Sequence, residues 1–397
     1  MAAIGGVFSL VDTRNDTDAL VRMSRAMLPR GGSEREAYIS ESIGMFFGRG
    51  CDSTESPMAV NTVGSVGADG RSNSEFMLLC DGEIFTGDEK SGERARFFGE
   101  SDAAIALEGF MRYGGEMGEH FSGEFAIAAY DGRRKELLLL RDSSGGRPLY
   151  YLREGDRIAF ASEIKGLLAF MESPAAISRE NLCRHVFSSC GQLGGCDIYR
   201  DIFEVERGGG CVCSRISTVP FFYKSMERTH RDVYPRTVGG DFVCPDEDGL
   251  NRLLTEILFV FDYPQFDHLM PSFLRDLRMA KDIGGTVAVS DGSLCMDIPY
   301  STQRRDRLSV MAGARVPCVP PSRVTVRERG LKKMERVLKN ILLETDRGEL
   351  CYIFGDDWER QISEIGNAER RIRAMGMMAQ AGVFLRSYRL DRNVAYK

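Results

Sequence analysis

Cysteine and histidine side chains are the first candidates for nucleophilic or metal chemistry in this 397-residue chain. Its eleven cysteines are scattered without a C-x-x-C pair, and its four histidines lie far apart in the sequence. A zinc site or a disulfide framework needs closely spaced ligands or paired cysteines. The spacing therefore indicates neither, and we expect no metal site. Cys211 and Cys213 would share one face of a strand, and we expect them to be buried free thiols.

A second candidate for chemistry is the glycine-rich stretch RDSSGGRPLYYL at 141–152. It lacks the spacing and the lysine of a phosphate-binding P-loop, and it connects two predicted strands rather than a strand and a helix. We interpret it as a hairpin with a glycine turn. In such a turn Asp142 bonds backbone amides, while Gly145 and Gly146 supply positive φ angles.

The elements that would position these residues differ between the two halves of the chain. Up to about residue 215, short apolar segments separated by glycine-rich turns predict strands, as in EFMLLCDGEIF at 75–85. Amphipathic helices are expected near 16–30 and 100–114, each with a capping residue at its start. This half is predicted to be α+β.

A polar stretch rich in turn residues at 216–248 predicts a linker. Beyond it, apolar residues recur at helical spacing in 251–261, 270–284 and 327–344, and GTVAVS at 285–290 predicts a short strand. The second half is therefore predicted to be α/β, and RRIRAMGMMAQAGVFL at 370–385 is predicted to be a packing helix.

Charge and hydropathy exclude some classes of partner. The 52 Lys and Arg against 58 Asp and Glu give a net charge of -6, spread along the chain rather than collected in tails, so we expect no nucleic acid partner. No stretch approaches the roughly 18 to 20 apolar residues of a membrane span. The first 30 residues lack the pattern of a signal peptide, and we expect a cytoplasmic protein without membrane attachment.

Read in order, segments of the first half resemble the glutaminase domain of glutamine-dependent asparagine synthetases. They are MAAIGGVF (1–8), RGG (30–32), FFGR (46–49), CDGEIF (80–85), ESDAAIAL (100–107), SGEFAIAAYD (122–131), RDSSGGRPLYY (141–151) and FASEIKGLL (160–168), with DIYRDIFEVERGG (197–209) resembling the segment that closes this domain. The stretch 261–292 resembles a synthetase-domain helix and strand that lead to an ATP-contacting loop.

The resemblance implies an N-terminal-nucleophile fold of the class II glutamine amidotransferase type, an αββα sandwich, over residues 1–215. After the linker at 216–248, it implies a reduced α/β domain of the ATP-pyrophosphatase type at 249–397. Members of the family hydrolyse glutamine in the first domain and pass ammonia to an adenylated aspartate in the second. ATP and Mg are thus the cofactors that the resemblance implies.

Carried over residue by residue, the resemblance assigns a glutamine site. Arg49 lies where the family holds the substrate carboxylate, and Asp102 where a carboxylate binds the α-amine. Gly82 and Glu83 match the last two residues of an Asn-Gly-Glu motif that contacts substrate, and the Gly82 amide could stabilise an oxyanion.

The same comparison shows two losses in the reaction centre. Ala2 occupies the position of the nucleophilic cysteine, and a methyl group cannot attack a carbonyl. Asp81 replaces the asparagine whose amide donates to the oxyanion, and a carboxylate there would repel the developing charge. Cys80 and Cys51 are the nearest alternative thiols, but no His or Lys lies close in sequence to lower either pKa.

The second half lacks the S-G-G-x-D-S pyrophosphate loop where the family has it. Ser290, Asp291 and Gly292 match part of a later ATP-contacting loop; a second alignment makes VAVSDGSLCMD at 287–297 an altered pyrophosphate loop. Both alignments predict weak nucleotide binding.

Three functional hypotheses follow. The first is an asparagine-synthetase-like pseudoenzyme that acts by binding a small molecule such as glutamine, a protein partner or a second copy of itself. The alternative is an active asparagine synthase or other amide-forming amidotransferase that uses an unrecognised nucleophile or a partner subunit. The third is a truncated product without a settled function.

Overall fold

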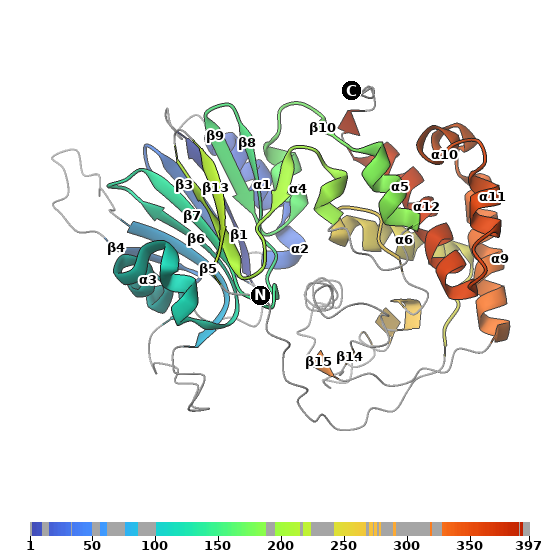
Figure 1. Ribbon diagram of the computed structural model, residues 1–397, viewed down its shortest axis with the longest axis horizontal. Coiled ribbons are helices and arrows are strands. Elements are labelled where there is room, and N and C mark those ends of the chain that lie inside the picture. Colours follow the sequence, from blue (N-terminus) through green and yellow to red (C-terminus); the bar gives the residue numbers. More distant parts are fainter. Residues whose placement is uncertain are drawn as a thin grey trace. The chain divides into compact units, whose positions relative to one another are not determined.

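A computed structural model describes most of the chain, which forms two compact units: residues 1–173 with 201–229, and residues 174–200 with 230–397 (Figure 1). The described residues are 2–9, 16–32, 34–49, 56–61, 76–85, 101–187, 195–214, 217–223, 242–266, 270–272, 274–275, 278, 289–290, 318–319, 328–388 and 390–391. The stretch 174–200, expected in the first domain, belongs to the second unit.

The first unit is built on two antiparallel sheets of six strands each. The first sheet has the order β11-β8-β9-β1-β3-β2, formed by β1 (Ala2–Ser9), β2 (Arg35–Ile39), β3 (Ile43–Arg49), β8 (Tyr150–Glu154), β9 (Arg157–Ala161) and β11 (Ile202–Glu204). The second has the order β13-β12-β7-β6-β5-β4, formed by β4 (Met58–Asn61), β5 (Phe76–Phe85), β6 (Ser122–Asp131), β7 (Glu136–Arg141), β12 (Gly209–Cys213) and β13 (Thr218–Phe222).

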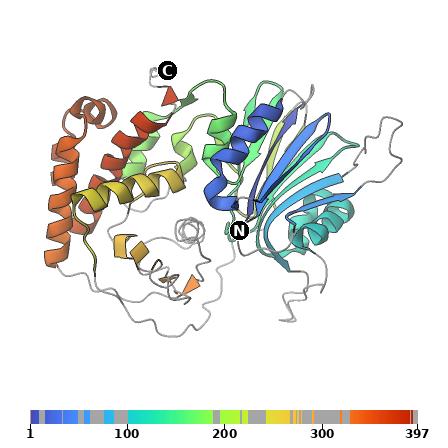
Figure 2. The same cartoon turned by 180° about the vertical axis from the view of Figure 1, so that it is seen from behind.

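Helices cover the outer face of each sheet, as Figures 1 and 2 show. The first sheet is covered by α1 (Thr17–Ala26), α2 (Leu28–Gly31) and α4 (Ile164–Phe170), and the second by α3 (Asp102–Tyr113), which continues into the 3-10 helix η2 (Gly114–His120). The expected helix caps are partly present. Ser101 Oγ accepts from Ala104 N at the start of α3, and Gly114 ends it with a positive φ, but Asp16 makes no side-chain cap on α1.

Strand alternation explains why β1 is buried on both faces. Ala2, Ile4 and Phe8 belong to the apolar core between the two sheets, together with residues of β3, β5, β6, β7 and β9. Because successive strand side chains point to opposite faces, Ala3 and Val7 turn toward the helices. A Cβ on Gly31 of α2 would lie 2.7 Å from that of Ala3, so α2 packs closely on β1. The first residues of β1 are thus covered by the second sheet on one face and by α2 on the other.

The interpretation of 141–152 as a hairpin is wrong. β7 ends at Arg141 in the second sheet, whereas β8 begins at Tyr150 in the first, so the stretch crosses from one sheet to the other. Arg141 and Asp142 hold this crossover from inside. The buried Arg141 guanidinium donates to the carbonyls of Arg147, Gly145 and Val205 and forms an ion pair with Glu204. A sequence pattern of two strands around a glycine turn does not distinguish a hairpin within one sheet from a crossover between two sheets.

The described part of the second unit is mainly helical. Its helices are α5 (Arg179–Phe187), α6 (Glu247–Phe261), α9 (Glu328–Glu344), α10 (Arg347–Phe354), α11 (Trp358–Ser363) and α12 (Ala368–Ser387); its short strands are β10 (Ala175–Ala176), β14 (Val289–Ser290), β15 (Cys318–Val319) and β16 (Leu390–Asp391), with η3 (Gly195–Ile198). The methionines of α12 are buried, as a packing helix requires. The α/β synthetase-like architecture of this half remains a prediction.

Within the described ranges, no helix is long and apolar enough to cross a membrane. In those same ranges, no group of three or more His, Cys, Asp and Glu side chains could hold a metal ion. Cys211 and Cys213 lie on β12 as expected, both buried and without a disulfide bond, with their sulfur atoms 3.8 Å apart. β13 falls within 216–248, so part of the expected linker is the edge strand of the second sheet.

Candidate functional site

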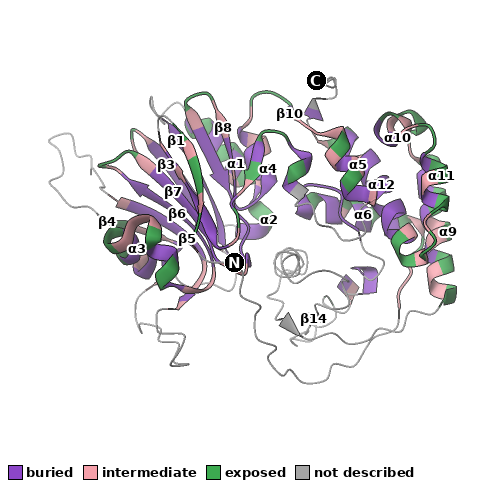
Figure 3. Cartoon of the chain, viewed as in Figure 1, coloured by how far each residue is buried: buried purple, intermediate pink, exposed green. Residues whose placement is uncertain are grey.

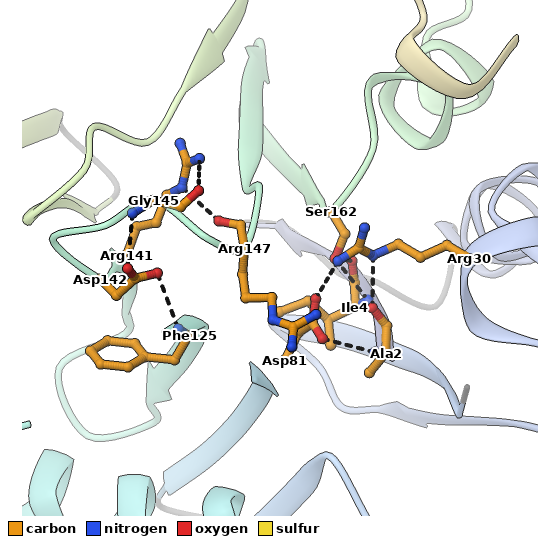
Figure 4. A network of polar contacts seen from close by, with 10 residues as sticks. All are labelled: Ala2, Ile4, Arg30, Asp81, Phe125, Arg141, Asp142, Gly145, Arg147 and Ser162. Atoms are coloured by element: carbon orange, nitrogen blue, oxygen red, sulfur yellow. Dashed lines mark hydrogen bonds and ion pairs between the residues drawn. The ribbon is translucent and has the colours of Figure 1, made fainter. Parts of the chain in front are cut away.

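A three-residue network encloses the amino end of β1 (Figure 4). The backbone amide of Ala2 donates to Asp81 Oδ1 at 2.8 Å, and Arg30 Nε donates to the Ala2 carbonyl at 2.8 Å. Arg30 Nη2 lies 2.6 Å from Asp81 Oδ2 and completes the ring. We call these three residues the Ala2–Arg30–Asp81 network. It links β1 of the first sheet, α2 and β5 of the second sheet.

Both charged side chains of the network are fully buried, with none of either side chain exposed. Removing two charges from water costs several kcal/mol per ion, which only close geometry and further hydrogen bonds offset. The two hydrogen bonds to Ala2 provide that compensation. Asp81 is therefore an acceptor whose oxygens are directed to Arg30 and to the Ala2 amide.

This arrangement determines what the reaction centre can do. The Ala2 methyl group belongs to the core between the sheets, so the position that the resemblance assigns to a nucleophile holds only carbon and hydrogen. Beside it stands a carboxylate rather than a hydrogen-bond donor. The Asp81 carboxylate accepts from Arg30 and from the Ala2 amide, and it has no hydrogen to donate to an oxyanion.

Arg49 lies directly opposite Ala2 in the pairing of β1 with β3. Its side chain is 25% exposed and forms ion pairs with Glu36 at 3.0 Å and Glu34 at 3.6 Å. Both glutamates are exposed, and exposed pairs of this kind contribute about 0 to 1 kcal/mol. A ligand carboxylate could therefore exchange with them at the Arg49 guanidinium.

Asp102 begins α3 next to the part of β5 that carries Gly82 and Glu83. Its Oδ1 accepts from the Ile84 amide at 2.9 Å, which joins the start of the helix to β5. A carboxylate in the first turn of a helix is also stabilised by the helix dipole. The structure thus brings Asp102, Gly82 and Glu83 together, and it places Arg49 beside Ala2 on the facing sheet.

Gly82 is required by close packing. Its φ is 142°, and a Cβ at this position would lie 2.0 Å from the Glu124 carbonyl oxygen on β6. Such a φ lies in a region that residues with a side chain rarely adopt. Glu83 and Glu124 stand opposite each other across the same two strands.

Cys80 is not suited to act as the alternative nucleophile. Burial raises the pKa of the Cys80 thiol well above its usual value, and the carboxylates of Asp102 and Asp81 raise it further against the opposing effect of Arg147. A protonated, enclosed thiol is a poor nucleophile. Cys51 lies outside the described residues.

The crossover between β7 and β8 carries Arg147 to this region, and Figure 4 shows its side chain pointing toward the Asp81 side of the network. Asp142 bonds backbone amides as predicted, accepting from Phe125 N, Ser144 N and Gly145 N. Burial raises the Asp142 pKa, and its hydrogen bond with Ser144 acts in the opposite direction. Gly145 has the predicted positive φ of 67°, whereas Gly146 does not, and that part of the prediction is wrong.

The residues expected to contact nucleotide are mostly outside the described part of the chain. Ser290 is in β14, opposite Val319 of the parallel strand β15. Asp291 and Gly292 lie outside the described residues, so the nucleotide site remains a prediction.

The sequence analysis missed the role of Arg30. The resemblance included Arg30 only within the segment RGG (30–32), although Arg30 is the ion-pair partner of Asp81. The available signal was an arginine in a largely apolar region together with an aspartate in an apolar strand, since buried charges are normally paired. Neither residue alone indicates which charge is its partner.

Two six-stranded antiparallel sheets stacked between helices, with the amino end of β1 enclosed between them, define an N-terminal-nucleophile αββα sandwich. The sequence profile of the glutamine amidotransferase domain matches residues 1–220, more than half of the chain, and the chain belongs to this family. The expected fold of the first half is thereby confirmed.

Individual relatives match over shorter segments. The chain is 28% identical over 168 residues to asparagine synthetase [glutamine-hydrolyzing] 3 of Bacillus subtilis, covering 41% of this chain and 27% of that protein. It is 27% identical over 138 residues to amidase chry2 of Gibberella zeae, covering 34% of this chain and 20% of that protein. The matches therefore span about a quarter of these relatives' length.

One solved structure that the chain resembles is a glutamine phosphoribosylpyrophosphate amidotransferase from B. subtilis. The alignment covers 83% of this chain and 70% of that one, at 11% identity and a TM-score of 0.35.

Proposed function

We propose that this chain is an asparagine-synthetase-like member of the glutamine amidotransferase family that does not hydrolyse glutamine and acts by binding an amino-acid ligand. The observation that carries the proposal is the Ala2–Arg30–Asp81 network. It places a methyl group and a paired carboxylate where the family's reaction needs a thiol and a hydrogen-bond donor.

The ligand-binding half of the proposal is supported by the groups that remain. Arg49 presents a partly exposed guanidinium that can hold a carboxylate through two hydrogen bonds. Asp102 supplies a carboxylate for an ammonium group, beside Gly82 and Glu83. We infer that Arg49 and Asp102 act on one ligand, a free amino acid whose carboxylate and ammonium groups they would hold, and glutamine is the first ligand to test.

A glutaminase assay tests the catalytic half of the proposal. Ammonia release from glutamine by the purified protein, with and without ATP, Mg and aspartate, is expected to equal the buffer background. Release above background that persists after repeated purification would overturn the proposal and favour the alternative, an amidotransferase with another nucleophile.

Calorimetry with glutamine tests the binding half. Replacing a charged partner of a ligand costs about 1.5 to 3 kcal/mol, so Arg49→Ala is expected to weaken binding roughly 10- to 100-fold. Arg134→Ala is the matched control because Arg134 is a 75% exposed arginine of the same unit, and it should leave the affinity unchanged. Equal affinities for wild type and Arg49→Ala, or no binding by either, would contradict a ligand role for Arg49.

A further inference from the structure

The exposed face of α9 carries an uninterrupted row of positive charge. Arg329, Lys332, Arg336 and Lys339 recur at the three- and four-residue spacing of one helix face, with Lys333 at its border, and all five are exposed. We call these five residues the basic face. Over its length of about 15 Å it faces away from the buried stripe of Met334, Leu338, Ile341 and Leu342. Figure 3 shows exposed segments along this helix.

Among the described residues, most of the positive charges on this face have no ion-pair partner. Lys332 pairs with Glu328 at 2.7 Å, and Lys333 Nζ donates to the Cys244 carbonyl at 3.4 Å. Within the part of the chain that the structure describes, Arg329, Arg336 and Lys339 have no ion-pair partner.

Some other exposed arginines of the same unit do form ion pairs. Arg347 lies 3.5 Å from Glu359, and Arg386 lies 3.0 Å from Glu349. Like charges three or four residues apart destabilise a helix. The basic face therefore retains a repulsion between its own side chains.

We propose that the basic face of α9 is the docking surface for an acidic segment of a partner protein. Carboxylates from such a segment would relieve the repulsion and pair with Arg329, Arg336 and Lys339. The basic face is only about 15 Å long on a chain of net charge -6, so it suits a short acidic segment better than an extended polyanion such as nucleic acid. A membrane surface is also disfavoured, because the apolar side of α9 is already buried and cannot insert. This inference is independent of the proposed ligand site.

The test uses the full chain and a fluorescein-labelled ten-residue oligoglutamate peptide, followed by fluorescence anisotropy at low salt. Wild type is expected to bind the peptide, with an affinity that falls as salt is added. The variant Arg329→Glu/Arg336→Glu/Lys339→Glu should bind at least about tenfold more weakly, because each exposed pair contributes up to about 1 kcal/mol. Arg329→Gln/Arg336→Gln/Lys339→Gln, which introduces no new repulsion, should show a smaller loss.

The matched control is Arg25→Glu/Arg112→Glu/Arg134→Glu, which makes the same change in net charge at exposed positions of the first unit. Its peptide affinity should stay within about twofold of wild type. No binding by wild type, or an equal loss in the control, would overturn the proposal. Tighter binding to a 20-base-pair DNA duplex or to phosphatidylserine vesicles than to the peptide would also overturn it, in favour of a different class of partner.

Discussion

The buried ion pair of the Ala2–Arg30–Asp81 network permits a quantitative prediction of stability. At an effective dielectric constant of about 20, unit charges 2.6 Å apart attract each other by about 6 kcal/mol before desolvation is subtracted. Removing one partner of a buried pair costs about 3 to 5 kcal/mol. Asp81→Asn keeps an oxygen that can accept one hydrogen bond, so we expect a loss of about 3 kcal/mol from the first unit.

A double-mutant cycle separates the pair from its surroundings. Arg30→Met/Asp81→Leu removes both charges and leaves the Ala2 amide and carbonyl without these partners, at an expected cost of about 1 to 3 kcal/mol. The double variant should therefore be less destabilised than the two single variants added together, with a coupling of about 2 kcal/mol. Glu36→Gln breaks the exposed pair with Arg49 and serves as the control, with an expected loss under about 1 kcal/mol.

Urea unfolding can report the two units separately. The single tryptophan, Trp358, lies in α11 of the second unit, so its fluorescence follows that unit alone. Far-UV circular dichroism near 215 nm reports both units, and the part of its change that does not coincide with the tryptophan transition follows the sheets of the first unit. Asp81→Asn should move the sheet transition to lower urea and leave the tryptophan transition in place. A sheet transition shifted no further than that of Glu36→Gln would refute the reasoning that the pair is essential once buried.

Three further predictions follow from the site. Ala2→Cys/Asp81→Asn should release ammonia from glutamine in the coupled glutaminase assay, whereas Ala2→Cys alone should not, because Asp81 would still oppose the oxyanion; equal activity of the two would contradict this. Gly82→Ala should destabilise the first unit by about 3 kcal/mol or more. The control Gly155→Ala should cost about 1 kcal/mol, because its added Cβ meets nothing within 4 Å. The midpoints of urea unfolding measure the stability of both variants. Because its pKa is raised in the folded state, Asp142 binds more protons there than when unfolded, so wild type should gain stability over Asp142→Asn as the pH falls from 7 toward 4. An unchanged difference across that range in urea titrations would argue against burial as the dominant effect.

Local patterns in the sequence predicted individual elements better than their connections. The helical spacing of Leu20 and Met23 gave α1, and the stripe of Met334, Leu338 and Leu342 gave α9, because one apolar face must be buried. The path from β7 to β8 was missed because a strand pattern does not state which sheet the strand joins.

For the candidate site, too, the residue types were easier to predict from the sequence than the contacts between them. Its residue types could be proposed from the ordered motifs, but their pairing depends on contacts between distant segments. Arg49 faces Ala2 only through the register of β1 and β3. Asp81 meets Arg30 across 51 positions of sequence, and the structure is needed to show that this carboxylate is neutralised rather than directed at a ligand. The nucleotide residues and the cytoplasmic location remain predictions.

The mutual dependence of Arg30 and Asp81 also constrains the order in which substitutions can accumulate. An asparagine at position 81 would leave the buried Arg30 charge without its carboxylate, and an uncharged residue at position 30 would leave the Asp81 charge in the same condition. A lineage in which either residue changed first would therefore pass through a less stable intermediate unless a third residue compensated. The Ala2–Arg30–Asp81 network thus makes substitutions at positions 30 and 81 epistatic, because each is tolerated best when the other also changes.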